Sequence, residues 1–294
     1  MTEFLYICGI KVIGTNNLKH RNMKKNKLWM LAAILICGAS VFTSCNNTDR
    51  PVSKAEEPVI DNLAEKVIGK WIVDEKDGKP ALTNQKLVIS FESATKVGIS
   101  LSYQAFWQSH NEFEYKIDGN VISCAKQMDE HTFTNSVVKV KSIDADKMVE
   151  DFSNTISIDG VEVIKLESKE TLKRVTDDYT TAILGLWEGR GTSEMSSEFD
   201  DGEEHRWEYK ADGKFYFYNK VNGEWQLSDD ALSDYFVDGP LLCTRWKNNG
   251  ENTTENREWW EIESIKDGVM KWTALRQKED GTTYTATFEM TKVE

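Results

Sequence analysis

The chain has 294 residues, of which 39% are hydrophobic and 29% charged, and its net charge is −13 at pH 7. This length is sufficient for two small domains, each with a core of its own. The acidic balance argues against a nucleic-acid partner, because phosphate backbones are bound by clustered Lys and Arg side chains.

A secretory signal is expected near the N-terminus. Met23 opens a lysine-rich start, an apolar run extends from Leu28 to Val41, and small residues lead to Cys45. The apolar run is shorter than the roughly 20 residues that span a bilayer, so a transmembrane helix is the weaker interpretation. The ending resembles the lipobox of bacterial lipoproteins, and this resemblance implies cleavage before Cys45 and attachment of a lipid to it.

The N-terminal 62 residues divide into three expected segments. We expect residues 1–22 to be an upstream extension that results from a misassigned start codon, with Met23 as the true start. Residues 23–44 are expected to be the signal peptide, and 45–62 a polar tether. Residues 1–44 carry six Lys or Arg and one Glu, so their removal leaves 30 basic and 48 acidic residues, a net charge of −18. Asn46 directly after the cysteine resembles the outer-membrane default of many Gram-negative lipoproteins. Surface-export signals of Bacteroidota resemble an acidic cluster at this place, where this chain has only Asp49. These resemblances imply an outer-membrane lipoprotein on the periplasmic face rather than the cell surface.

The rest of the chain reads as a tandem duplication, with unit 1 at 63–176 and unit 2 at 177–294. An apolar lead-in and a Gly-x-Trp triplet occur twice, ending at Trp71 and Trp187. Two further segments, 115–122 and 137–143, match 235–242 and 259–265. The offsets of 116, 120 and 122 residues increase slowly, as loop insertions require.

Within both units the local pattern is that of β-strands. Asp-Gly occurs eight times and Asn-Gly once, at 222–223, and these dipeptides favour tight hairpin turns. Alternating apolar runs lie between them, such as the run at 283–290. Only residues 63–68, 146–152 and 229–235 look briefly helical.

A short helical lead-in, a Gly-x-Trp triplet and a hairpin meander resemble lipocalins, and more closely the lipocalin-like modules of Bacteroidota lipoproteins. We therefore expect an all-β fold of two tandem antiparallel meander β-barrels, abridged relative to a full lipocalin; a β-sandwich is the alternative. A barrel leaves no open sheet edge. The resemblance implies that Trp71 and Trp187 are structural and close their barrels.

No catalytic signature is found. The nucleophile elbow, the His-Glu-x-x-His motif and the phosphate-binding loop are all missing from the sequence. We expect no enzyme activity, no cofactor and no metal. The acidic run at 200–205 lacks the alternating ligands of a calcium loop and is interpreted as a solvated hairpin tip.

Aromatic residues are the more informative feature. Seven of the nine tryptophans after Cys45 fall in unit 2. The candidate ligand-binding residues share a strand face with apolar neighbours; they are Trp260, Trp272, Tyr284 and Phe288. They either fill the barrel or line a cavity, and filling is the more common arrangement. Trp259 faces the other way, where it either contacts a partner or covers the neighbouring unit, the latter being favoured.

The leading hypothesis is a lipid-anchored, non-catalytic binding protein of the bacterial envelope, with a small apolar or amphipathic ligand in the second barrel. The alternatives are a surface module with filled barrels that binds glycan or protein, and a structural spacer. Cys124 and Cys243 look like repeat partners but do not align cleanly. Without a bulge, period 2 places them on opposite strand faces, and Pro240 could provide such a bulge, so their equivalence is open. Whether they form a disulfide is open as well, although buried free thiols are the more common arrangement.

Overall fold

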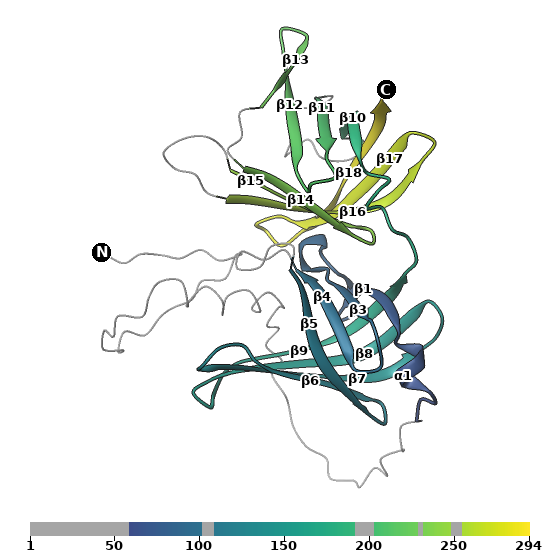
Figure 1. Cartoon of the computed structure of the whole chain (residues 1–294), viewed down its shortest axis with the longest axis vertical. Helices are drawn as coiled ribbons and strands as arrows, with labels where there is room; N and C mark the ends of the chain where they lie inside the picture. The colour runs from purple at the N-terminus through teal and green to yellow at the C-terminus, as the bar shows by residue number, and fades with distance from the viewer. Residues whose placement is uncertain (1–58, 102–108, 192–202, 229–231, 248–254) are drawn as a thin grey trace, which may run out of the picture.

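The computed structural model describes residues 59–101, 109–191, 203–228, 232–247 and 255–294. The expected signal peptide, Cys45 and nearly all of the tether lie outside the described residues, as do 200–202 of the acidic run. Two nine-stranded antiparallel sheets, one in each unit, lie one above the other along the long axis of the molecule (Figure 1).

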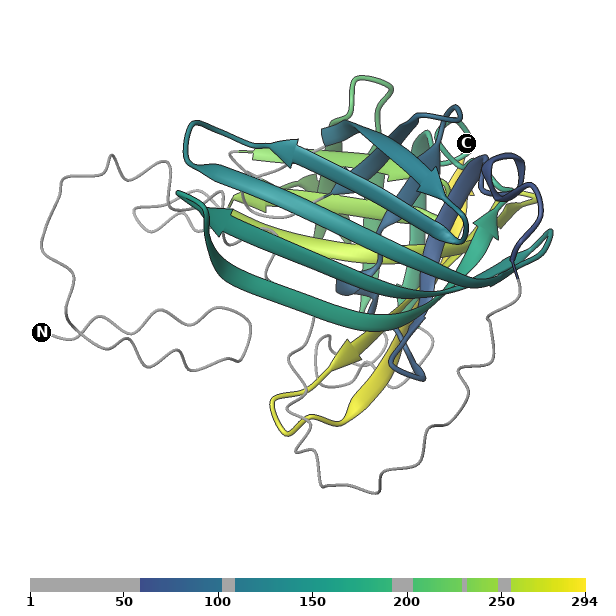
Figure 2. The same cartoon turned by 90° about the horizontal axis from the view of Figure 1, so that it is seen from below.

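Unit 1 is a closed meander. Its elements are α1 (Leu63–Lys66), β1 (Gly69–Lys76), β2 (Lys79–Pro80), the 3₁₀ turn η3 (Thr83–Gln85), β3 (Val88–Phe91), β4 (Lys96–Leu101), β5 (Ser109–Asp118), β6 (Val121–Gln127), β7 (Thr132–Ile143), β8 (Lys147–Ile158) and β9 (Val161–Val175). The short strand β2 pairs with β1. From β3 onward each strand pairs with the next, β1 pairs with β3, and β9 returns to pair with β1, which closes the barrel. Figure 2 shows the long strands β7 to β9, in teal, curving around this unit.

Unit 2 repeats the meander but remains partly open. Its strands are β10 (Gly185–Gly191), β11 (Glu204–Tyr209), β12 (Phe215–Val221), β13 (Glu224–Leu227), β14 (Leu232–Asp238), β15 (Leu241–Lys247), β16 (Glu255–Lys266), β17 (Val269–Gln277) and β18 (Thr283–Val293). The sheet curls so that β10 pairs with β18, while β13 and β14 form its two ends. The expected all-β fold of two tandem, abridged barrels is thereby confirmed.

The Asp-Gly and Asn-Gly dipeptides in the described parts of the chain lie at turns, as expected; Asp201-Gly202 lies outside the described residues. Four pairs have both residues at positive φ, the geometry of type I′ hairpins, at 77–78, 159–160, 222–223 and 267–268.

Two of the three expected helical segments are wrong. The segment at 63–68 contains α1, but 146–152 lies in β8, and the described part of 229–235 begins β14. In β8, pairing with β7 on one side and β9 on the other outweighs the weak local helical preference.

The two Gly-x-Trp triplets have the same structure in both units. Trp71 and Trp187 are fully buried, and each donates its indole N–H to a carbonyl four residues earlier, over 2.7 Å. The last strand of each unit places a cation over the ring, Arg174 at 4.1 Å from the Trp71 centroid and Lys292 at 5.3 Å from that of Trp187. Each tryptophan belongs to the main hydrophobic cluster of its own unit.

The outer faces of the two units pack against each other. An apolar cluster joins side chains of β1 and β3 to side chains of β14 and β15, with Val175 and Trp259 packed against it; its buried members are Ile72, Val88, Phe236, Leu241 and Cys243. Polar contacts surround this cluster. Lys70 Nζ lies 2.6 Å from Asp238, and Lys86 Nζ lies 2.5 Å from Glu261.

This interface decides two of the open questions. Trp259 is half-buried against the cluster between the units rather than on a free surface. Cys243 belongs to the same cluster, whereas Cys124 packs inside barrel 1, and no disulfide joins them. Their positions on opposite faces follow the period of 2.

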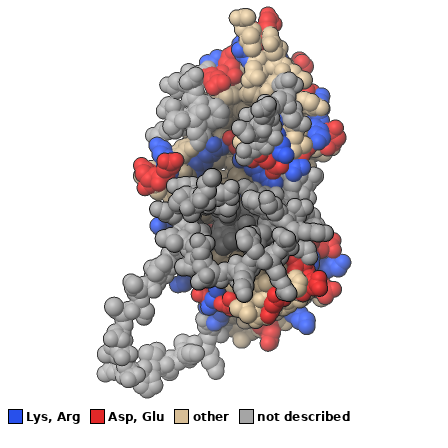
Figure 3. All heavy atoms as spheres, turned by 90° about the vertical axis from the view of Figure 1, so that its left-hand side faces the viewer, with Lys and Arg blue, Asp and Glu red and all other residues tan. Residues whose placement is uncertain are grey.

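Acidic and basic side chains intermix over the described part of the face shown in Figure 3. Among the described residues, no helix is both long and apolar enough to cross a membrane.

Candidate ligand-binding site

A cavity of about 150 Å³ lies inside the sheet of unit 2. Its walls come from β11, β12, β15, β16 and β17, which present ten side chains: His205, Trp207, Tyr209, Phe215, Phe217, Thr244, Trp246, Glu258, Trp260 and Trp272. Seven of these ten carry the ring of a Trp, Tyr or Phe residue. The described side chains of barrel 2 therefore do not fill it completely, and the space that they leave has mostly aromatic walls.

Two of the four candidate residues line this cavity, namely Trp260 and Trp272. Phe288 is fully buried and packs against both of their rings, with centroids 5.4 and 6.2 Å away. Tyr284 packs at the edge of the same core. The four residues thus belong to one cluster, with two at the cavity wall and two behind or beside it.

The remaining walls were not among the candidate residues. His205, Trp207 and Tyr209 come from alternate positions of β11, and Phe215 and Phe217 from alternate positions of β12. Alternation of aromatic residues marked both segments in the sequence. What the sequence did not indicate is that these strands face β15 and β16 across one space.

The rings form a continuous network around the cavity. Trp207 lies 5.5 Å from Trp272 and 6.0 Å from Phe217, measured between ring centroids. Trp260 stacks on Trp272 at 5.9 Å and 30°, and His205 stacks on Trp207 at 5.1 Å and 8°. Distances in this range are typical of favourable aromatic pairs, which hold one another in place.

The polar groups of the wall have distinct protonation states. Burial lowers the pKa of His205, which keeps its imidazole neutral, although Glu203 acts in the opposite direction. Burial raises the pKa of Tyr209 well above its usual value, and Tyr235 and Glu258 add to this effect. The phenol therefore stays protonated.

Glu258 is held at the wall by two neighbours. It accepts a hydrogen bond from Trp260 Nε1 over 3.1 Å, and Arg276 Nη2 lies 3.8 Å from its other oxygen. The Arg276 guanidinium also lies over the Trp260 ring, 4.4 Å from the centroid.

A seam between β12 and β14 adjoins the cavity. In unit 1 the corresponding strands β4 and β5 pair over six residues. In unit 2 the described backbone has one isolated bridge at this place, between Lys214, directly before β12, and Asp234 of β14. The correspondence is supported by Tyr115 and Tyr235, whose hydroxyls both donate to a backbone carbonyl over 2.7 Å. Figure 1 shows β12 and β13 rising away from β14 and β15 above the seam.

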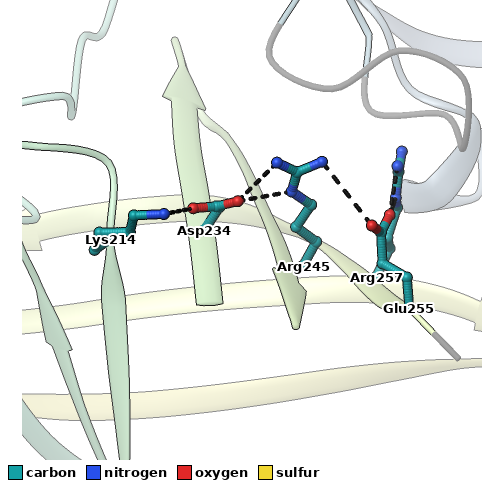
Figure 4. Close-up of polar contacts among 5 residues, drawn as sticks. All are labelled: Lys214, Asp234, Arg245, Glu255 and Arg257. Carbon is teal, nitrogen blue, oxygen red and sulfur yellow. Dashed lines mark hydrogen bonds and ion pairs between the residues drawn. The ribbon is translucent and has the colours of Figure 1, made fainter. Parts of the chain in front are cut away.

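Charged side chains connect the seam across its outer face (Figure 4). Asp234 accepts from Lys214 on one side and from Arg245 Nε and Nη2, at 2.9 and 2.7 Å, on the other. Arg245 also reaches Glu255 at 3.9 Å, and Glu255 pairs with Arg257 at 2.5 Å. Burial acts to raise the pKa of Asp234, but the hydrogen bonds from Lys214 and Arg245 outweigh it and lower the pKa.

The interior of barrel 1 differs in kind at the corresponding position. In barrel 1, Glu150 of β8 lies directly opposite Glu170 of β9 in the strand register. The corresponding residues of barrel 2 are Trp272 of β17 and Phe288 of β18. Glu150 is 3% exposed, and burial together with Glu170 raises the pKa of its carboxyl group well above the usual value. Among the residues that the structure describes, this interior pair is therefore acidic in unit 1 and aromatic in unit 2.

Metal-binding geometry was also considered. Within the described parts of the chain, no three His, Cys, Asp or Glu side chains converge as ligands would.

Comparison with known proteins adds little. No protein-family model and no curated protein matches the chain. Among solved structures, a protein of unknown function from the DUF3598 family of Nostoc punctiforme PCC 73102 aligns with 78% of this chain and 97% of its own, at 9% identity and a TM-score of 0.20. A likeness at this level carries no argument about fold or function.

Proposed function

We propose that this protein is a lipid-anchored, non-catalytic binding protein of the bacterial envelope, which holds a small apolar or amphipathic ligand in its second barrel. The observation that carries the proposal is the cavity of about 150 Å³ with seven aromatic residues in its wall. An engineered apolar cavity of about this size is known to hold one benzene molecule. The ligand is therefore small, or only one ring of it enters the barrel.

The lipocalin-like assignment belongs to this proposal. It is supported by the meander that closes through β1 and β9 and by the two buried tryptophans of the Gly-x-Trp triplets. The fold alone does not define a ligand, because one architecture serves many functions.

Attachment to the membrane through Cys45 rests on the sequence of residues 23–45. The outer membrane, on its periplasmic side, is the proposed location. Replacement of Cys45 by Ser should abolish incorporation of a labelled fatty acid in cells, and protease treatment of intact cells should leave the protein uncut. Labelling of the Cys45→Ser variant, or cleavage on intact cells, would contradict the anchor or the periplasmic side respectively.

Binding is tested by titrating the mature protein with benzene and toluene. Four tryptophans line the cavity, so occupancy should change the tryptophan fluorescence and raise the melting temperature as ligand concentration increases. A Thr244→Phe variant fills the cavity and should abolish both effects. The matched control is Thr291→Phe, which places the same ring at an exposed position of β18. Unchanged spectra and melting temperatures at saturating probe would refute the proposal.

The glycan- or protein-binding alternative loses its leading residue, because Trp259 packs between the two units. The spacer alternative requires filled barrels, and the cavity in unit 2 argues against it.

A further inference from the structure

We infer that the cavity of barrel 2 selects a small organic cation, that is, an ammonium group attached to a short apolar or aromatic body. This inference rests on the proposed function and adds the charge of the ligand to it. Three features of the wall point the same way: its aromatic rings, its single carboxylate, and the position of Arg276.

The first feature is the density of aromatic rings. An aromatic ring presents a negative face, so a cation within about 6 Å of the centroid is attracted to it, and tryptophan gives the strongest effect. Trp207, Trp260 and Trp272 contribute three indole rings with neighbouring centroids 5.5 and 5.9 Å apart. Several rings around one space are the arrangement that recognises quaternary and alkylated ammonium groups.

The second feature is the charge of the wall. Among the described residues that line the cavity, Glu258 bears the one carboxylate, and none is a Lys or Arg. His205 does not supply a positive charge, because its burial favours the neutral imidazole. An anionic ligand would meet aromatic rings and a carboxylate, and the cation beside that carboxylate, Arg276, is already engaged with Trp260 and Glu258. An ammonium group is complementary to both the rings and the carboxylate.

The third feature is that the chain already places a cation against the same two groups. Arg276 lies over the Trp260 ring at 4.4 Å and within 3.8 Å of Glu258. Arg276 is not one of the lining residues. Its position shows that the Trp260 ring and the Glu258 carboxylate together hold a cation in this protein. A ligand ammonium group would make the same pair of contacts from the cavity side.

The volume limits the size of the cation. About 150 Å³ accommodates a trimethylammonium head or one phenyl ring, and excludes a long acyl chain. The cations that fit are thus about the size of choline or benzylamine.

The test compares choline with 3,3-dimethylbutan-1-ol, which has the same shape without the charge, by calorimetric titration of the mature protein. We expect choline to bind at least tenfold more tightly than the alcohol. A Glu258→Gln variant should lose about tenfold in choline affinity while its affinity for the alcohol stays unchanged. The control Glu263→Gln removes an exposed carboxylate of the same strand, paired with Lys271 at 2.8 Å, and should leave both affinities unchanged.

A second variant, Trp246→Leu, tests the inference even if Glu258→Gln does not fold. Trp246→Leu keeps an apolar side chain at the wall but removes a ring face, and should weaken choline more than the alcohol. The inference is overturned if the alcohol binds as tightly as choline, or if Glu258→Gln weakens both equally; the cavity then takes neutral ligands and the proposed function stands. If choline, the alcohol, benzene and toluene all fail to bind, the proposed function falls as well.

Discussion

At the scale of single residues, the two units differ most at one interior pair. Glu150 and Glu170 stand opposite each other in barrel 1, where barrel 2 has Trp272 and Phe288. Glu170 has partners, since Ser168 Oγ lies at 2.7 Å and Lys76 Nζ at 3.4 Å from its Oε1. Glu150 is the more deeply buried of the two, and its raised pKa expresses the cost of ionising it there.

A Glu150→Gln variant should therefore be more stable than the wild type at neutral and higher pH. A raised folded-state pKa means that the stability associated with this group is present below the usual carboxyl pKa of about 4.5 and is lost as the pH rises through the folded-state pKa. The melting temperature of the variant should exceed that of the wild type at pH 8, by about 2–4 °C for each kcal/mol regained. The difference should disappear below pH 4.

The control is Glu167→Gln, which changes an exposed carboxylate of the neighbouring strand β9 and should leave the pH profile unchanged. Equal melting temperatures of wild type and Glu150→Gln at pH 8 would contradict the prediction.

The glycine of the second Gly-x-Trp triplet is the other residue with a specific requirement. Gly185 has a φ of +116°, and a Cβ there would lie 3.0 Å from Lys292 Cε, the side chain that covers Trp187. Gly185→Ala should lower the free energy of unfolding by about 1–3 kcal/mol. Denaturant titration measures this loss. Gly268→Asn, in an open hairpin turn with no neighbour within 4 Å, should change it little, and a similar loss in both variants would show that crowding at residue 185 is not the cause.

At the scale of elements, the seam between β12 and β14 distinguishes the two barrels. β4 and β5 share a full ladder in unit 1, while β12 and β14 share one bridge. The β4–β5 ladder contributes regular backbone hydrogen bonds along both strands. Since the described seam between β12 and β14 lacks such a ladder, it depends more on its side chains. Asp234 is the residue that joins both sides, because it accepts from Lys214 and from Arg245.

Asp234→Ala should loosen the seam and destabilise unit 2 by about 2 kcal/mol, since charge-assisted hydrogen bonds are lost and Arg245 keeps a partly buried charge. Hydrogen exchange should become faster in β12 and β14. As a control, Glu167→Ala removes a pair that is exposed on both sides, and exposed pairs contribute little. Unchanged exchange in β12 and β14 of Asp234→Ala would exclude the proposed role of Asp234.

At the scale of the whole molecule, the two barrels are coupled by an apolar interface. Phe236 belongs to this interface together with Ile72 and Val88 from unit 1, and ion pairs such as Lys70–Asp238 connect the same two surfaces. Because this cluster is separate from the two barrel cores, the units are expected to unfold together only while it is intact.

Phe236→Ala should remove part of this coupling. Truncation of a buried phenylalanine costs about 3–5 kcal/mol, and here the loss falls on the contact between units. Calorimetry of the mature protein should show one transition for the wild type and two separated transitions for the variant. A single transition at an unchanged temperature would show that Phe236 does not couple the units.

The sequence by itself determined the fold class, because hairpin turns and alternating strands are local features. Asp-Gly and Asn-Gly at four turns supply the positive φ values that type I′ hairpins need, and the two Gly-x-Trp triplets identify equivalent first strands. It also indicated Trp260 and Trp272 correctly as residues of one interior face. Two of the three short helical predictions failed, and in β8 strand pairing on both sides overrode the local preference.

Only the tertiary structure decided how that interior is used. Whether Trp272 fills a barrel or lines a cavity depends on the side chains that β11, β12 and β15 bring to the opposite wall, and these lie 26 or more residues away along the chain. The same holds for Trp259, which packs against a cluster that includes Ile72 and Val88 of the other unit. Local pattern specifies which face of a strand is apolar, but contact between distant strands determines whether that face meets a core, a ligand or another domain.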